Sequence, residues 1–120
     1  LQVGDEVIRL LRIRYGDDEP LVVSANTLPR TVLPGPLEHR DWSGSLTAAL
    51  AAHGHHVNAS IATISAVELP SDWERRYKLD GLGPWLLVTE VGMTRQGTRV
   101  LYAADYHRGS EISFSVLRQR

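Results

Sequence analysis

The sequence contains no cysteine among its 120 residues. The absence of thiols excludes disulfide bonds, cysteine nucleophiles, and zinc or iron–sulfur sites built on cysteine. It is also compatible with a reducing compartment, and we expect the protein to be cytoplasmic. No apolar run approaches the roughly 20 residues that a membrane-spanning helix needs. The first residues lack both the basic n-region and the apolar h-region of a signal peptide. We therefore expect no membrane partner.

The sequence also lacks an excess of positive charge. Lysine and arginine total 13, aspartate and glutamate total 14, and the formal net charge is −1. A domain that binds DNA by itself normally carries a basic surface that neutralises phosphates, so we expect no direct contact between these residues and nucleic acid. The length predicts a single domain over residues 1–120. The missing initiator methionine is compatible with a piece of a longer protein.

Motifs of the common catalytic centres are missing as well. There is no Gly-x-Ser-x-Gly elbow, no phosphate-binding loop and no His-Glu-x-x-His sequence. His53, His55 and His56 are close in sequence, but they straddle a predicted helix end and a turn, so their side chains should diverge rather than converge on a metal. We expect no metal and no cofactor, and no catalytic nucleophile stands out.

Hydrophobic periodicity predicts an α+β domain. Short turns between neighbouring strands favour a mainly antiparallel sheet flanked by helices, and the helices are expected to cover one side of it. Prolines at three positions interrupt residues 29–41, which are predicted to form a loop. A Ser-x-x-Glu capping box is expected at Ser71 and Glu74. The predicted strands cover residues 7–15, 21–28, 56–69, 85–94, 99–108 and 111–116, and the predicted helices cover residues 46–53 and 71–79.

The first strand carries two arginines on one face. Side chains of a strand alternate between faces with a period of two, so Arg12 and Arg14 point the same way. Two guanidinium groups in this arrangement can clamp a phosphate or a carboxylate. Alternatively, they form a solvated surface that pairs with Asp17, Asp18 or Glu19.

The strand at residues 99–108 places Asp105 and His107 together on one face. These side chains can bind sugar hydroxyls or amino groups, or act as an acid–base pair. A surface salt bridge near the strand end is the alternative. The opposite face is expected to point into the core, and it comprises Val100, Tyr102, Ala104 and Tyr106.

Gly44 and Ser45 precede the helix predicted at residues 46–53. Serine is a good N-cap, and the free amides and positive dipole at a helix start attract anions. An ordinary cap and an anion site are both compatible with this pattern, and the two roles can coexist.

Five segments follow known motifs in a consistent order. Residues 12–20 resemble an R-x-R-x-A-D-G-x-P hairpin, residues 27–29 a Y-L-P element and residues 44–46 a G-S-L-Y helix start. Residues 79–88 resemble an L-G-L-x-x-G-x-P-L-L-x-V passage, and residues 99–109 resemble an R-P-V-E-Y…Y-Y-R-G-D sequence. Together these motifs resemble those of the UTRA domain, the effector-binding domain of the HutC subfamily of GntR-type transcription regulators. The resemblance extends from about residue 5 to the end of the chain.

The resemblance implies a chorismate-lyase-like α+β fold and a homodimer. It also implies that DNA is bound only by a separate N-terminal winged helix-turn-helix domain, which is absent from this chain. The implied function is to bind a small-molecule effector and control a bacterial repressor, without enzymatic activity.

The resemblance also implies site residues. Family members with phosphorylated sugar effectors hold the phosphate with the arginine pair and the serine, which correspond to Arg12, Arg14 and Ser45. This sequence departs from the family pattern at Leu101 and Ser24, where the family has glutamates. His107 and Ser110 replace a tyrosine and an aspartate.

We therefore expect an anionic metabolite (a phosphate, phosphonate or carboxylate) that differs from an amino-sugar phosphate. The expected ligand-binding residues are Arg12, Arg14, Ser24, Ser45, Asp105 and His107.

Two alternatives use the same residues differently. A lyase on the same fold would hold an aromatic carboxylate with Arg12 and Arg14 and use Asp105 or His107 as acid or base. The other alternative is a pure dimerisation module, which a free, long, apolar edge strand would favour.

Overall fold

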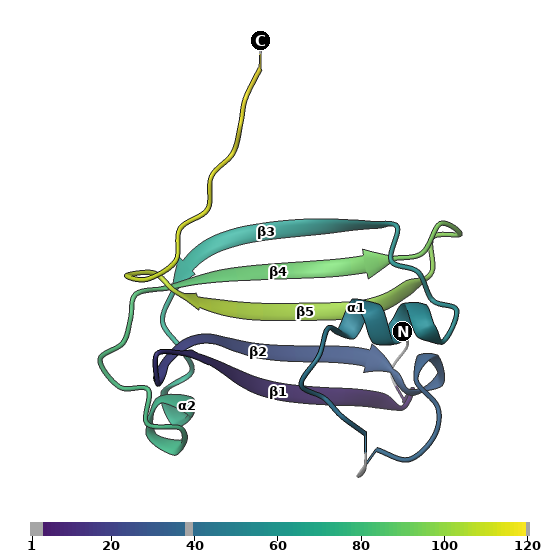
Figure 1. Cartoon of the computed structure of the whole chain (residues 1–120), viewed down its shortest axis with the longest axis horizontal. Coiled ribbons are helices and arrows are strands. Elements are labelled where there is room, and N and C mark those ends of the chain that lie inside the picture. The colour runs from purple at the N-terminus through teal and green to yellow at the C-terminus, as the bar shows by residue number, and fades with distance from the viewer. Residues whose placement is uncertain (1–3, 38–39, 120) are drawn as a thin grey trace.

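The computed structural model describes residues 4–37 and 40–119 (Figure 1). Within these ranges, five strands form one sheet in the order β1-β2-β5-β4-β3, and every neighbouring pair is antiparallel. The predicted α+β fold with an antiparallel sheet is confirmed. The strands are β1 (Val7–Gly16), β2 (Glu19–Pro29), β3 (Ala59–Val67), β4 (Trp85–Met93) and β5 (Arg99–Arg108), and the helices are η1 (Arg30–Val32), α1 (Leu46–Ala52) and α2 (Ser71–Arg76).

β1 and β2 form a hairpin with a two-residue turn. Asp17 and Asp18 both have positive φ, 51° and 65°, and Gly16 pairs with Glu19 on either side of them. A turn with two left-handed residues matches the right-handed twist of the strands, and aspartate tolerates this conformation better than most residues. The hairpin therefore fixes the register that places the β1 arginines opposite β2.

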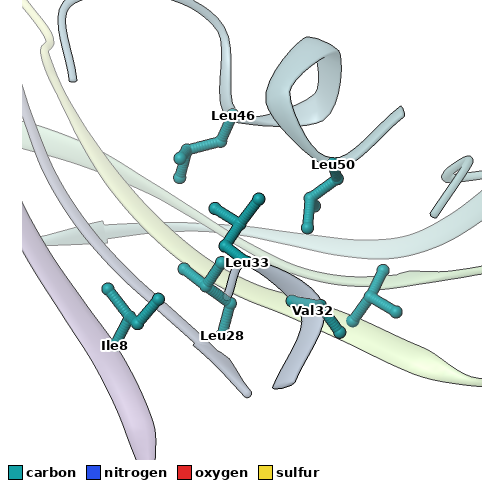
Figure 2. Close-up of a cluster of buried hydrophobic side chains, with 7 residues drawn as sticks. Ile8, Leu28, Val32, Leu33, Leu46 and Leu50 are labelled. Carbon is teal, nitrogen blue, oxygen red and sulfur yellow. The ribbon is translucent and has the colours of Figure 1, made fainter. Parts of the chain in front are cut away.

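The two α-helices lie against opposite faces of the sheet. Leu28 of β2 belongs to a cluster with Leu46 and Leu50 of α1 (Figure 2), whereas Val23 of β2 belongs to a second cluster, onto which Trp73 of α2 packs. Residues 23 and 28 of one strand have opposite parity and point to opposite faces. The expectation that the helices cover one side is therefore wrong, because both faces carry apolar side chains that need cover.

A bulge in β5 changes which side chains reach the first cluster. Gly92 pairs with Leu101 and Met93 pairs with Arg99, which leaves Val100 as an extra residue. Val100 is fully buried in the α1 cluster, and Leu101 packs against the same cluster.

The bulge also separates Val100 from the residues expected to share its face. Tyr102 is 45% exposed, and Tyr106 packs edge-on against Trp73, with ring centroids 5.6 Å apart. The prediction of one core-facing side through Val100, Tyr102, Ala104 and Tyr106 is therefore wrong.

The strand predicted at residues 111–116 is also absent. After a turn at residues 109–111, the segment has no regular structure and runs away from the sheet (Figure 1). The physical reason lies in the sheet order, since β5 already pairs with β2 on one side and β4 on the other. A strand that follows β5 through a short turn finds no free edge beside it.

The remaining elements differ from prediction mainly at their ends. The first helix stops at Ala52 with His53 as C-cap, and Gly54 follows with φ of 85°. Its neighbouring strand, β3, is shorter than the predicted residues 56–69, and the loop predicted at residues 29–41 contains η1. The capping box expected at residues 71 and 74 does not form, because Pro70 is the N-cap of α2 and no side chain caps its amides.

Candidate functional site

A cavity of about 320 Å³ lies between the start of α1 and the sheet. All six residues that the sequence singled out for ligand binding line it. Their contribution to binding stays a prediction. The complete lining comprises Arg12, Arg14, Val22, Ser24, Asn26, Ser45, Leu46, Thr47, Glu90, Leu101, Ala103, Asp105 and His107.

Strand register brings these residues together. Arg12 of β1 pairs with Ser24 of β2, and Ser24 pairs in turn with Asp105 of β5. Directly paired residues point to the same face of a sheet, and adjacent strands are about 4.8 Å apart. Arg14 and His107 lie in the neighbouring row, joined through Val22. The floor of the cavity therefore includes β1, β2 and β5, with arginines on one side and Asp105 with His107 on the other, and Glu90 extends it to β4.

Arg12 links the sheet to the loop that precedes α1. Its Nη1 donates to the carbonyl oxygens of Trp42 at 3.1 Å and Gly44 at 2.9 Å, and its Nη2 donates to Oδ1 of Asn26 at 3.2 Å. Burial lowers the pKa of the Arg12 guanidinium, as does nearby Arg14, while Asp105 raises it. The alternative of a solvated ion pair does not hold for Arg12, which is a structural link as well as part of the cavity wall.

Arg14 is different because its guanidinium is free. Within residues 4–37 and 40–119, it makes no hydrogen bond and no ion pair, and its side chain is exposed. The carboxylate of Glu19 pairs with Arg108 instead, at 3.3 Å. Arg14 is thus a cation at the cavity that is available to an anionic ligand.

Ser45 forms the predicted N-cap of α1. Its Oγ accepts a hydrogen bond from the amide of Ala48 at 3.3 Å, and it lies 2.8 Å from Oγ1 of Thr47. The cap holds the two hydroxyl groups at the cavity, where both can contact a ligand.

Asp105 and His107 line the cavity without bonding to each other. No hydrogen bond joins their side chains in the described part of the chain. Burial lowers the pKa of the His107 imidazole, and Arg14 lowers it further, against the opposing effect of Asp105. His107 therefore favours its neutral form near pH 7. Its ring packs edge-on against Phe114, with centroids 5.0 Å apart.

Three polar cavity residues were missed from the sequence: Asn26, Thr47 and Glu90. Asn26 pairs with Ala103, which pairs with Glu90 of β4, so the two polar residues lie in one row. Alternation along β4 could have placed Glu90 on one face with Val88, but only the pairing with β5 shows that this face lines the cavity.

No group of three or more potential metal ligands was found among the described residues. Nδ1 of His53 lies 3.0 Å from the carbonyl oxygen of Ala49 within the helix end. In the same part of the chain, no helix is long and apolar enough to cross a membrane.

Comparison with known proteins identifies a matching sequence family and solved structures with a similar fold. A sequence model of the UTRA domain matches residues 1–113, and no curated protein matches the sequence. The effector domain of PhnF from Mycobacterium smegmatis superposes with a TM-score of 0.88 at 21% identity, covering 100% of this chain and 74% of that chain.

Two further solved structures give the same result. A GntR-family transcriptional regulator from Enterococcus faecalis has a TM-score of 0.79 at 24% identity, covering 98% of this chain and 85% of that chain. The effector-binding domain of the trehalose repressor TreR from Bacillus subtilis has a TM-score of 0.81 at 15% identity, covering 100% of this chain and 83% of that chain. These similarities confirm the expected chorismate-lyase-like fold.

Proposed function

The chain belongs to the UTRA family, the effector-binding domains of GntR/HutC-type transcription regulators, and we propose that its cavity binds a small anionic metabolite. Binding would control the affinity for DNA of a separate winged helix-turn-helix domain. The proposed ligands are phosphates, phosphonates and carboxylates.

The observation that carries this proposal is the free guanidinium of Arg14 in a cavity that also presents hydroxyl groups. An unpaired arginine attracts oxyanions and can donate two parallel hydrogen bonds to them. Ser45 and Thr47 place their hydroxyl groups at the same cavity. An anion there would contact both β1 and the start of α1.

Arg12 supplies the physical route from ligand to regulation. It holds the carbonyl oxygens of Trp42 and Gly44, just before α1. A ligand that engages Arg12 or Ser45 competes with or reinforces these bonds, and so shifts the position of α1. By linkage, the effector must bind one conformation of the regulator more tightly than the other.

Arg14→Ala is expected to lower the affinity for the best-bound anion by roughly tenfold or more. A hydrogen bond to a charged group contributes about 1.5–3 kcal/mol, and the exposure of Arg14 favours the lower end. Isothermal calorimetry against a panel of phosphorylated sugars, phosphonates and carboxylates measures the effect. Arg99→Ala is the matched control, because Arg99 is exposed and lies outside this cavity. The proposal fails if no anion binds the wild-type chain more tightly than Arg14→Ala.

The lyase alternative does not hold. UTRA domains are non-enzymatic parts of transcription regulators, which agrees with the sequence prediction that the chain is not an enzyme. Asp105 and His107 are better understood as cavity walls.

We also propose that two copies of the domain pair through β3. This strand is one of the two sheet edges, and its nine residues include no charge and no proline. Ile61 and Ile64 are 69% and 52% exposed. Natural edge strands are usually protected by charges, prolines or bulges, and β1, the other edge, has arginines and a bulge. An unprotected edge of this length suits an antiparallel contact with its own copy across a two-fold axis.

Ile61→Lys is expected to weaken the dimer by roughly 100-fold, because each copy loses about 1.5 kcal/mol of apolar burial and gains a charge at the contact. Sedimentation equilibrium measures the dissociation constant. Thr98→Lys, in the exposed turn before β5, is the control. An unchanged dissociation constant in Ile61→Lys, or a monomeric wild-type chain, would show that β3 is not the interface.

A further inference from the structure

The cavity is polarised across the sheet. Its two arginines come from β1, and its two carboxylates, Asp105 and Glu90, come from β5 and β4 on the other side. β2 lies between β1 and β5, and it contributes the uncharged Ser24 and Asn26. Positive and negative charge are therefore separated by a polar strip rather than neutralised in direct pairs.

Neither carboxylate is directly paired, although Asp105 lies close enough to Arg12 to raise the pKa of its guanidinium. Neither Asp105 nor Glu90 makes a hydrogen bond or an ion pair within residues 4–37 and 40–119, and both residues are partly buried. A carboxylate that is partly removed from water loses hydration, and an unpaired one is costly unless a cation or donor compensates it. Because no donor or cation of the described residues contacts them directly, this side of the cavity is suited to a positive group.

The geometry of the floor leaves room for such a group. Asp105 and Ala103 follow each other on the same face of β5, and Ala103 is paired with Glu90. Ala103, which lines the cavity, carries only a methyl group and therefore occupies little of the space between the two carboxylates. From the spacing of strands and residues, the Cα atoms of Asp105 and Glu90 are roughly 8 Å apart, a separation that lets both side chains reach one ammonium group.

We infer that the effector is a zwitterion, with an oxyanion at Arg12 and Arg14 and a cationic group at Glu90 and Asp105. This inference rests on the proposed function and narrows its ligand class. A simple anion satisfies only the β1 side and is repelled by the carboxylates. A zwitterion satisfies both sides, so the carboxylates select against anions that lack a positive group.

The strand register also limits the size of the ligand. The Cα columns of Arg12 and Glu90 are separated by three strand spacings, roughly 14 Å. An arginine and a glutamate that extend toward each other cover much of this distance. The ligand is therefore small, with its charges separated by a short chain.

Matched pairs of probes test the inference by calorimetry. ω-Aminoalkylphosphonates of two to four carbons are compared with alkylphosphonates of equal length, and ω-amino carboxylates are compared with the corresponding alkanoates. We expect the best amino compound to bind the wild-type chain about tenfold more tightly than its uncharged-tail partner, since one charge-assisted contact is at stake.

Glu90→Gln keeps the shape of the side chain and removes its charge. It is expected to abolish most of the preference for the amino compound while leaving the affinity for the alkyl compound unchanged or slightly higher. Asp105→Asn is a second, independent variant with the same expected direction. Glu68→Gln, which changes an exposed glutamate outside the cavity, should keep the full preference.

The outcomes separate this inference from the function on which it rests. Equal affinity for both members of every pair, with loss of binding in Arg14→Ala, overturns the zwitterion and leaves the anion site in place. A preference that persists undiminished in both Glu90→Gln and Asp105→Asn also overturns it. If neither member of any pair binds the wild-type chain, the anion site and the zwitterion are both wrong.

Discussion

Trp85→Ala is expected to lower the free energy of unfolding by about 3–5 kcal/mol, the range for replacing a buried large aromatic with alanine. Trp85 is only 2% exposed and lies in the second hydrophobic cluster with Val23, Leu69 and Leu79. Removing the indole leaves a cavity bounded by two strands and by the loops on both sides of α2. In a small domain this loss is a large share of total stability.

Chemical denaturation followed by circular dichroism measures this change. A loss of about 3–5 kcal/mol corresponds to a fall in Tm of roughly 10–20 °C. Phe114→Ala is the control, because Phe114 is 45% exposed and lies outside both clusters. A loss below about 1 kcal/mol in Trp85→Ala would mean that the second cluster does not hold the domain together.

Arg12→Ala is expected to affect stability and ligand binding together. The variant loses donors to two backbone carbonyl oxygens and to Asn26, whose side chain is almost completely buried. A buried acceptor left without a donor costs about 1–3 kcal/mol, and we expect a total loss of about 2–3 kcal/mol in unfolding free energy. The affinity for the best-bound anion should fall by roughly 100-fold, since a charge and the position of the loop before α1 are lost together.

Comparison with Arg14→Ala isolates the structural role of Arg12. Arg14 has no partner in the described residues, so its removal should lower ligand affinity with an unchanged midpoint of denaturation. Arg12→Lys should recover the charge but little of the stability, because an ammonium cannot reproduce the planar fork of a guanidinium. Equal stability of Arg12→Ala and Arg14→Ala would contradict the link between the sheet and the loop before α1.

Alternation within one strand was sufficient to predict part of the site. Arg12 and Arg14 lie on one face of β1, and Asp105 and His107 lie on one face of β5, because the period of two is a local property of the backbone. The family resemblance placed both strands and Ser45 around one ligand. All of these residues do line one cavity.

Properties that depend on pairing between distant strands could not be predicted in the same way. Glu90 reaches the cavity only because of its register with Ala103. The side on which Val100 lies depends on a bulge that is defined by two strands together. The two α-helices lie on opposite faces because each packs on a different hydrophobic cluster, and each cluster combines residues from several distant segments. The sequence of one segment alone does not show which cluster a helix joins.

Residues 111–116 show that a strand-like sequence pattern alone does not ensure that a strand forms. Their alternation of apolar and polar side chains is typical of a strand, but a strand also needs a neighbour with free backbone groups. β5 has no such edge, since it lies between β2 and β4. The alternating pattern therefore indicated a local preference for extended structure, but the order of the sheet leaves these residues no strand to pair with.

Because of the order of the sheet, a bound ligand would contact strands that are far apart in the sequence. The cavity walls come from β1 near the start of the chain and from β4 and β5 near its end, and they meet only when β2 pairs with β5. An unfolded or half-assembled chain has no such site, so any effector binds the complete sheet alone. A ligand at 100 times its Kd then adds about 2.7 kcal/mol to stability. Thermal-shift screening of unlabelled chain can thus find the effector without DNA or the rest of the regulator.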